Sequence, residues 1–259
     1  MRVIMTGGGT GGHIYPAVAI ADEIRRRDEN AEILFVGAEI GMEGDLVPKC
    51  GYKIELIPAD GFNRQKIINN LIAAKRIIKG TIKAKKIIKQ FKPDVVIGTG
   101  GYASAPVIKT AQNMNIPTYI HEQNAFPGMS NRIQEKKARR VFLGFGEAAK
   151  YFKCPEKHVV CGNPVREEIT KADTASAKRE LGVEGKTVIL SFGGSLGAAA
   201  VNKAMRSLAL HNTNKEDVVH FHVVGRYDEG EFVKFLDENN INDENKIKVY
   251  EYLYDIAKY

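Results

Sequence analysis

The opening of the chain constrains the fold most, because a short apolar run passes through a glycine-rich turn into a helical pattern. Residues 3–5 are typical of a buried strand, glycines occupy positions 7, 8, 9, 11 and 12, and apolar residues recur at helical spacing over residues 16–27. Strand, glycine turn and helix form the start of a βαβ unit. Since a plain turn needs only one or two glycines, this loop is expected to bring backbone N–H groups and a helix N-terminus close to an anion.

Strand and helix patterns alternate through the first 165 residues. Apolar strands are predicted at residues 33–36, 52–58, 95–97, 117–120, 141–143 and 158–160, and helices at residues 43–49, 65–90, 105–114 and 129–137. Apolar strands separated by helices indicate a doubly wound parallel sheet that is covered on both faces. The sequence therefore predicts the α/β class.

The same motif starts again after residue 170. A helix is predicted at residues 175–181, then a strand at 188–192, a glycine loop at 193–198 and a helix at 199–210. Strands at residues 220–224 and 248–252 follow, on either side of a helix at 229–239. We place the domain boundary so that residues 1–164 and 165–259 form two Rossmann-like domains. Because a complete domain of this type has about five or six strands, the second domain is expected to be incomplete.

Three glycine loops follow predicted strands, at residues 7–13, 98–102 and 193–198. Each is expected at the carboxyl edge of a parallel sheet, where open α/β sheets bind ligands, so we predict a cleft in which two domains close on phosphorylated ligands. His13 is a candidate general base, Arg166 a candidate diphosphate ligand and Ser195 a further donor. The spacing Gly-x-Gly-x-x-Gly at residues 7–12, with Glu39 after the second strand, also matches a dinucleotide fingerprint, so an NAD(P)-dependent oxidoreductase remains an alternative.

Composition argues against a membrane-spanning protein, a secreted protein and a protein built on disulfides or a cysteine metal site. No apolar run approaches the roughly 18 residues of a membrane span, and no signal peptide is expected. The three cysteines have neither disulfide-framework nor metal-site spacing, so no metal is predicted.

The basic residues are concentrated in one segment. Residues 62–92 contain ten Lys or Arg and no Asp or Glu, although the whole chain has a net charge of only +7. Gly80 is expected to break or bend this segment into two helices. A broad apolar stripe flanked by basic residues is the pattern of a helix on an anionic membrane surface, and sparse aromatic residues argue against nucleic acid. The expected membrane-facing residues are Ile67, Leu71, Lys75, Arg76, Ile78, Lys79 and Ile82.

Five motifs together resemble the MurG family of bacterial glycosyltransferases. They are TGGGTGGHIYP at residues 6–16, GTGGY at 98–102, HEQNAFPG at 121–128, GNPVR at 162–166 and GGSLGA at 193–198. This family adds N-acetylglucosamine from UDP-GlcNAc to the undecaprenyl-linked muramoyl-pentapeptide, lipid I, and so makes lipid II for peptidoglycan. The resemblance implies a GT-B fold, inversion at the anomeric carbon, no metal at the diphosphate and no cofactor. It also implies a peripheral protein at the cytoplasmic face of the inner membrane.

The resemblance assigns roles to residues at the matching positions. His13 would be the catalytic base, and the donor would be bound by Thr10, Gly11, Gly12, Asn124, Arg166, Ser195 and Leu253. The loop of Gly98, Thr99, Gly100, Gly101 and Tyr102 would face the acceptor diphosphate. The N-terminal domain would bind the acceptor and the membrane, and the C-terminal domain would bind the UDP-sugar.

One departure from the family is its length, since members extend roughly a hundred residues further, as the low strand number of the second domain suggests. The donor half of the site is therefore expected to be incomplete. A truncated fragment that binds membrane and acceptor without transferring sugar is the alternative.

Overall fold

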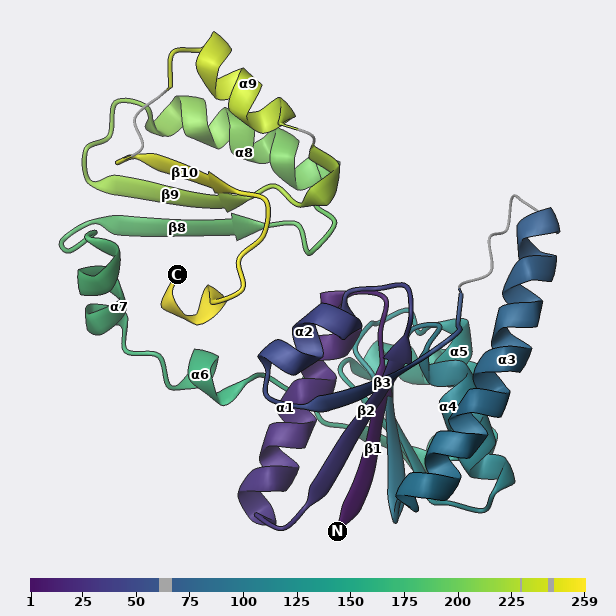
Figure 1. Ribbon diagram of the computed structural model, residues 1–259. Helices are drawn as coiled ribbons and strands as arrows, with labels where there is room; N and C mark the ends of the chain where they lie inside the picture. The colour runs from purple at the N-terminus through teal and green to yellow at the C-terminus, as the bar shows by residue number, and fades with distance from the viewer. Residues whose placement is uncertain (61–66, 229, 242–244) are drawn as a thin grey trace. The chain divides into compact units, whose positions relative to one another are not determined.

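The computed structural model describes residues 1–60, 67–228, 230–241 and 245–259, with side chains of helix α3 described from Lys75 onward. The chain divides into two compact units, Met1–Arg166 and Glu167–Tyr259 (Figure 1). Each unit is an α/β layer structure built on a parallel sheet, which confirms the predicted fold class.

The first unit is organised around seven parallel strands in the order β3-β2-β1-β4-β5-β6-β7. Their bounds are Arg2–Gly7 for β1, Glu32–Ala38 for β2, Lys53–Ile57 for β3, Val95–Gly100 for β4, Thr118–Glu122 for β5, Arg140–Leu143 for β6 and His158–Val160 for β7. The chain moves outward from β1 to β3 and then returns to the other side of β1 with β4. This reversal places the ends of β1 and β4 side by side, at the point where such sheets bind ligands.

Helices cover both faces of this sheet (Figure 1). They are α1 at Gly11–Arg27, α2 at Glu43–Lys49, α3 at Ile67–Phe91, α4 at Ser104–Asn113 and α5 at Met129–Gln134, with 3-10 turns at Glu135–Lys137, Gly146–Tyr151 and Pro155–Lys157. Helices α3 and α4 pack together, and α1 packs on α2. Ile4 of β1 and Val96 of β4 are buried in one cluster with Ile88 of α3 and Ile108 of α4. Because both faces are covered, the central strands are apolar on both sides, which is why their sequences lack polar alternation.

The prediction that Gly80 divides the basic segment into two helices is wrong. Helix α3 is continuous from Ile67 to Phe91. A Cβ atom on Gly80 would lie 2.2 Å from Pro58 O, so glycine lets the helix approach the backbone that follows β3. A single helical glycine costs only about 1 kcal/mol relative to alanine, and close packing offsets that cost.

Two predicted boundaries at the glycine loops also need correction. Helix α1 begins at Gly11, five residues before the predicted start, and Thr10 O accepts the N–H groups of His13 and Ile14. The apolar pattern misses this first turn because glycines carry no periodicity. Strand β4 continues to Gly100, so Gly98, Thr99 and Gly100 belong to the strand end.

The second unit has three parallel strands in the order β10-β9-β8. They are β8 at Thr187–Phe192, β9 at Val218–Val223 and β10 at Ile247–Tyr250. Its helices are α6 at Glu167–Thr170, α7 at Thr174–Leu181, α8 at Ala199–Asn212 and α9 at Glu231–Glu238, with 3-10 turns at Arg226–Asp228 and Ile256–Lys258. Helix α7 ends at Gly182, whose φ of 67° is the left-handed conformation that glycine favours. Phe232 and Leu236 of α9 pack in one buried cluster with Ala209 of α8.

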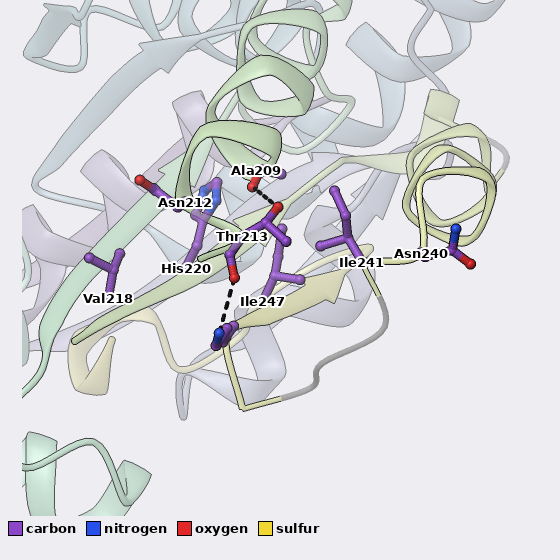
Figure 2. Close-up of a pocket in the computed structure, with 9 residues that line it drawn as sticks. Ala209, Asn212, Thr213, Val218, His220, Asn240, Ile241 and Ile247 are labelled. Carbon is purple, nitrogen blue, oxygen red and sulfur yellow. Dashed lines mark hydrogen bonds between the residues drawn. The ribbon is translucent and has the colours of Figure 1, made fainter. Parts of the chain in front are cut away.

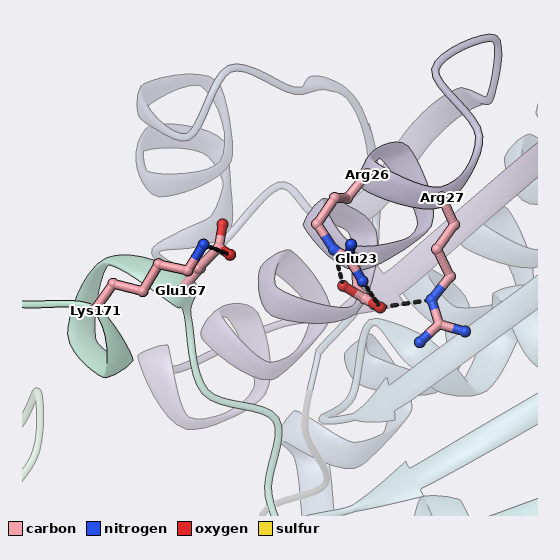
Figure 3. A network of polar contacts seen from close by, with 5 residues as sticks. All are labelled: Glu23, Arg26, Arg27, Glu167 and Lys171. Carbon is pink, nitrogen blue, oxygen red and sulfur yellow. Dashed lines mark hydrogen bonds and ion pairs between the residues drawn. The ribbon is translucent and has the colours of Figure 1, made fainter.

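Exposed ion pairs link side chains on neighbouring helical turns in both units (Figure 3). Glu23 accepts hydrogen bonds from Arg26 and Arg27 in the last turns of α1, and these bonds lower the pKa of Glu23 to about 2. Glu167 and Lys171 form a similar pair four residues apart. All of these side chains are solvent-exposed, so the pairs contribute little to the free energy of unfolding.

A small cavity of about 230 Å³ lies at the amino ends of β9 and β10 (Figure 2). Val218 and Ile247, the first residues of these strands, line it together with Thr213 and His220. The glycine loop at residues 193–198 follows the carboxyl end of β8 instead. The cavity therefore lies at the opposite edge of the second sheet from this loop.

Two histidines are buried beside the hydroxyl group of Ser191. Ser191 Oγ lies 2.6 Å from His220 Nε2 and 2.8 Å from His222 Nδ1. Burial and the neighbouring His222 together lower the pKa of His220 to about 4, and burial also lowers the pKa of His222. Both rings are therefore neutral in the folded protein at neutral pH.

Acid is expected to unfold the second unit through His220. An unfolded histidine has a pKa of about 6.5, so the unfolded state binds a proton first as the pH falls. The contribution of neutral His220 to the free energy of unfolding is fully present above about pH 6.5, and it is lost as the pH falls from about 6.5 to 4. Urea unfolding midpoints measured over this range should fall less steeply for His220→Gln than for wild type. His211→Gln is the matched control, because His211 is exposed. If the urea midpoint of His220→Gln falls with pH as steeply as that of wild type, His220 is not the group that causes the acid sensitivity.

Candidate active site

The first glycine loop is held by a buried carboxylate. Glu43, the first residue of α2, is fully buried, and its two oxygens accept the N–H groups of Gly9, at 2.9 Å, and Ala38, at 2.8 Å. Cβ atoms on Gly8 and Gly41 would lie 2.1 and 2.2 Å from the carboxylate oxygens of Glu43. Gly8 and Gly41 are therefore glycines because Glu43 occupies the space that a Cβ atom would need. Fewer glycines of the loop than the sequence suggests are explained by contact with a ligand.

The end of β4 supports the same loop from the other side. Thr99 is buried, and its hydroxyl donates to His13 O at 2.7 Å. Gly101 has a φ of 79°, and a Cβ atom there would lie 2.2 Å from Gly8 O. The Tyr102 ring lies close to Gly9, where a Cβ atom would be 2.8 Å from it. The residues of the second loop therefore pack against the first loop and fix its shape.

His13 lies in the first turn of α1, at the carboxyl edge of the sheet. Its Nδ1 atom lies 2.9 Å from Thr99 O and 3.1 Å from Gln123 Oε1. A Cβ atom on Gly100 would be 3.1 Å from the His13 ring, so β4 approaches the imidazole closely. Because Nδ1 donates to these oxygens, Nε2 of the neutral ring holds the free lone pair. This is the protonation state that a general base requires.

The loop after β5 is organised by a second buried carboxylate. Glu122 accepts hydrogen bonds from the backbone and side-chain nitrogens of Asn124, from Gly128 N and from Asn131 Nδ2, all at 3.0 Å. Asn124 is exposed. Because its amide nitrogen is held by Glu122, the amide oxygen is the atom that can accept a hydrogen bond from a ligand. The HEQNAFPG motif predicted Asn124 as a site residue, whereas nothing in the sequence indicated that Glu122 holds Asn124 in place.

Arg166 lies in the first unit and stacks on the first helix. Its guanidinium carbon is 4.5 Å from the centre of the Tyr15 ring, and Tyr15 is two residues from His13 along α1. The preceding GNPVR stretch is fastened to the loop after β5, since Asn163 Nδ2 donates to Gln123 O at 3.2 Å. The structure therefore brings Arg166 to the same helix as the glycine loop and His13.

The predicted site residues divide between the two units. Residues on the carboxyl edge of the first sheet are Thr10, Gly11, Gly12, His13, Gly98, Thr99, Gly100, Gly101, Tyr102 and Asn124, with Arg166 stacked on α1. Ser195 and Leu253 belong to the second unit, and both are half-buried. Ser195 lies in the loop after β8, where Gly197 has a φ of 85° and a Cβ atom would meet Val224 O at 2.2 Å. Across the described residues, no group of three His, Cys, Asp or Glu side chains is arranged to hold a metal ion.

The predicted membrane-facing residues lie on α3. Ile78 and Ile82 are 61% and 66% exposed, and Lys75 and Lys79 are exposed beside them. Arg76 instead pairs with Glu39 and Asp60, at 3.3 and 2.9 Å. The side chains of Ile67 and Leu71 lie outside the described residues. Helix α3 therefore presents isoleucines among lysines, while carboxylates of the same unit neutralise Arg76.

Comparison with known proteins places this edge of the sheet within a glycosyltransferase domain. The glycosyltransferase family 28 N-terminal domain matches residues 3–143. A relative from Caldicellulosiruptor saccharolyticus is 40% identical over 100% of the chain and 70% of its own length, and one from Clostridioides difficile is 41% identical over 96% of the chain and 62% of its own length. Both are named UDP-N-acetylglucosamine–N-acetylmuramyl-(pentapeptide) pyrophosphoryl-undecaprenol N-acetylglucosamine transferase.

The solved structures agree with this relationship. The crystal structure of Acinetobacter baumannii MurG is 28% identical and superposes with a TM-score of 0.64, over 99% of this chain and 70% of that chain. The resemblance and the GT-B type of fold that the sequence motifs predict are thereby confirmed. The chain belongs to glycosyltransferase family 28 and, within it, to the MurG family of N-acetylglucosamine transferases.

Proposed function

We propose that this protein transfers N-acetylglucosamine from UDP-GlcNAc to the lipid-linked muramoyl-pentapeptide, the reaction stated in the names of its relatives. The observation that carries the proposal is the position of His13. Its ring stands in the first turn of α1 with Nδ1 2.9 Å from Thr99 O, which leaves Nε2 to face a ligand. A base at a helix N-terminus, beside an anion-binding loop, suits an acceptor hydroxyl that attacks a sugar attached to a diphosphate.

The proposed step balances without a metal. His13 Nε2 takes the proton of the acceptor hydroxyl, while the oxygen of that hydroxyl forms a bond to the anomeric carbon of N-acetylglucosamine. The bond from this carbon to the β-phosphate oxygen of UDP breaks, and UDP leaves with the electron pair. Attack from the face opposite to the leaving group inverts the anomeric configuration. The imidazolium of His13 then returns its proton to solvent.

The carboxyl edge of the first sheet offers positive charge that can stabilise the negative phosphates of the donor. Helix α1 contributes the positive end of its dipole, its first turn contains no acidic residue, and Gly12 exposes its backbone there. Arg166 adds a guanidinium group suited to phosphate oxygens. The amide oxygen of Asn124 is assigned to a hydroxyl or N–H group of the sugar. Ser195 and Leu253 of the second unit are assigned to the donor diphosphate and the uracil.

We also propose that the first unit docks on anionic membrane through α3. No helix in the described parts of the chain is long and apolar enough to cross a bilayer. A helix that lies on the membrane can instead insert Ile78 and Ile82 while lysines such as Lys75 and Lys79 contact lipid phosphates. Such docking at the cytoplasmic face would bring the site to an acceptor anchored by its undecaprenyl chain.

Replacing the two exposed isoleucines tests the docking surface. The double variant Ile78→Ser and Ile82→Ser removes apolar area without changing charge, and we expect its affinity for vesicles containing anionic lipid to fall by about 10- to 100-fold. Vesicle co-sedimentation measures this affinity. Val233→Ser, an exposed apolar position on α9 of the second unit, is the matched control and should bind as wild type does. Equal binding by the double variant and the wild type would exclude this face of α3.

Calorimetric titration of the 259-residue chain tests the choice of donor. We expect UDP-GlcNAc to bind more tightly than UDP-glucose, with no heat from NAD. Binding of NAD without UDP-GlcNAc would instead favour an oxidoreductase. If none of the three ligands binds, the donor assignment for this chain is wrong. The alternative of a fragment that binds only acceptor and membrane would then be favoured.

A further inference from the structure

Two hydrogen bonds to backbone carbonyls fix the protons in a cluster of the half-buried His13 with the buried Gln123 and His121. Thr99 O lies 2.9 Å from His13 Nδ1, and because a carbonyl only accepts, Nδ1 of His13 carries a proton. Gly162 O lies 3.1 Å from His121 Nε2, so this nitrogen carries a proton for the same reason. These two assignments leave His13 Nε2 and His121 Nδ1 as acceptors in the neutral rings.

The side chain of Gln123 joins the two rings and has one orientation that satisfies both. Its amide nitrogen lies 3.3 Å from His121 O and 2.9 Å from His121 Nδ1, so the NH₂ group donates toward His121. Its Oε1 atom then faces His13 Nδ1 at 3.1 Å and accepts. Gln123 is only 8% exposed. Turning the amide over would place NH₂ against the N–H of His13 and oxygen against two acceptors of His121, with little water to relieve either contact.

Neutral His121 maintains this orientation. Burial lowers the pKa of His121, although the Gly162 carbonyl and Glu122 act in the opposite direction. The neutral ring accepts from Gln123 at Nδ1. A proton on that atom would instead repel the amide NH₂ of Gln123. The cluster therefore runs as a directed chain of hydrogen bonds, from His13 through Gln123 and His121 to the Gly162 carbonyl.

We propose that Gln123, oriented by His121, is a positioning residue that acts together with the Thr99 carbonyl to hold His13 as the Nδ1–H tautomer with Nε2 unprotonated. Free histidine in water favours the opposite tautomer, with the proton on Nε2, so the site has to impose the form that it uses. The functional meaning rests on the proposed role of His13 as the base, because only an unprotonated Nε2 can take a proton from the acceptor hydroxyl. Gln123 touches neither reacting group and acts through His13.

Nitrogen NMR of the histidine rings tests this proposal without substrate. In ¹⁵N-labelled wild-type chain at pH 8, we expect His13 to show a protonated Nδ1 and an unprotonated Nε2, and His121 to show the reverse. Gln123→Met keeps the length of the side chain but removes one of the two acceptors of the Nδ1 proton and leaves only Thr99 O. The share of the Nε2–H form of His13 should therefore rise until it becomes detectable. Gln123→Glu keeps an acceptor beside Nδ1 and should retain the wild-type tautomer of His13. Matching backbone amide spectra would show that each variant is folded.

Two results would overturn the proposal. One is a wild-type His13 with its proton on Nε2, which needs no variant to observe. The other is a folded Gln123→Met with ring shifts of His13 equal to those of wild type. Because the spectra require neither donor nor acceptor, they separate this proposal from the proposed function. In transfer assays, Gln123→Met should lower kcat by about tenfold or more while KM for the donor changes little, with partial recovery in Gln123→Glu.

Discussion

His13→Ala is expected to lower kcat for sugar transfer by about 10²- to 10⁴-fold. The variant removes the imidazole but keeps the hydrogen bond that the Thr99 hydroxyl donates to the backbone carbonyl of residue 13. The glycine loop therefore keeps this support. The proposed donor ligands do not include the His13 imidazole, so the dissociation constant of the donor should change little. Turnover measured with UDP-GlcNAc and lipid I, together with calorimetric donor binding, separates these two quantities.

The matched control is His211→Ala, because His211 is an exposed histidine on α8 of the second unit. It should transfer sugar at the wild-type rate. A His13→Ala variant with wild-type kcat would show that another group takes the proton. A variant that loses donor binding as strongly as turnover would show that His13 binds the donor and is not the base.

Glu43→Ala is expected to cost about 3–5 kcal/mol of the free energy of unfolding of the first unit. It would leave the buried N–H group of Ala38 and the partly buried N–H group of Gly9 without an acceptor, at about 1–3 kcal/mol each, and would open a cavity between α2 and the glycine loop. Urea unfolding followed by circular dichroism measures this loss. Hydrogen exchange at the Gly9 amide should also become much faster, because that amide is released directly.

Asp45→Ala is the matched control for this prediction, two residues further along α2. Asp45 is exposed and pairs with Lys49 four residues later, so its removal should cost at most about 0.5 kcal/mol. Similar losses for Glu43→Ala and Asp45→Ala would mean that the buried carboxylate does not hold the loop.

Features encoded by neighbouring residues could be predicted from the sequence. The alternation of apolar strands with helices predicted the α/β class, and the glycine loop marked the edge of the sheet on which His13 lies. Gly80 shows the limit of this reasoning. Its helix-breaking tendency is a local preference of about 1 kcal/mol, whereas its close contact with Pro58 depends on how α3 packs against the chain after β3.

Features that depend on contacts between distant residues could not be predicted. Glu43 reads as an ordinary acidic residue at a helix start, yet it reaches Gly9, 34 residues earlier in the chain. Gln123 lies 110 residues from His13, and only the order of strands brings β5 beside β4 and its end toward α1. The motif containing Gln123 was noticed through its resemblance to the family, but nothing in its spacing showed that its amide meets His13.

The most direct test of the central claim is a product measurement on the 259-residue chain. The chain is mixed with UDP-GlcNAc and lipid I in vesicles containing anionic lipid, and UDP and lipid II are quantified by mass spectrometry. We expect equal amounts of UDP and lipid II. Neither product should form when either substrate is omitted, and both should form about 10²- to 10⁴-fold more slowly when His13 is replaced by alanine. Intact UDP-GlcNAc and lipid I after incubation, in a chain that binds both, would contradict the claim that this protein transfers the sugar.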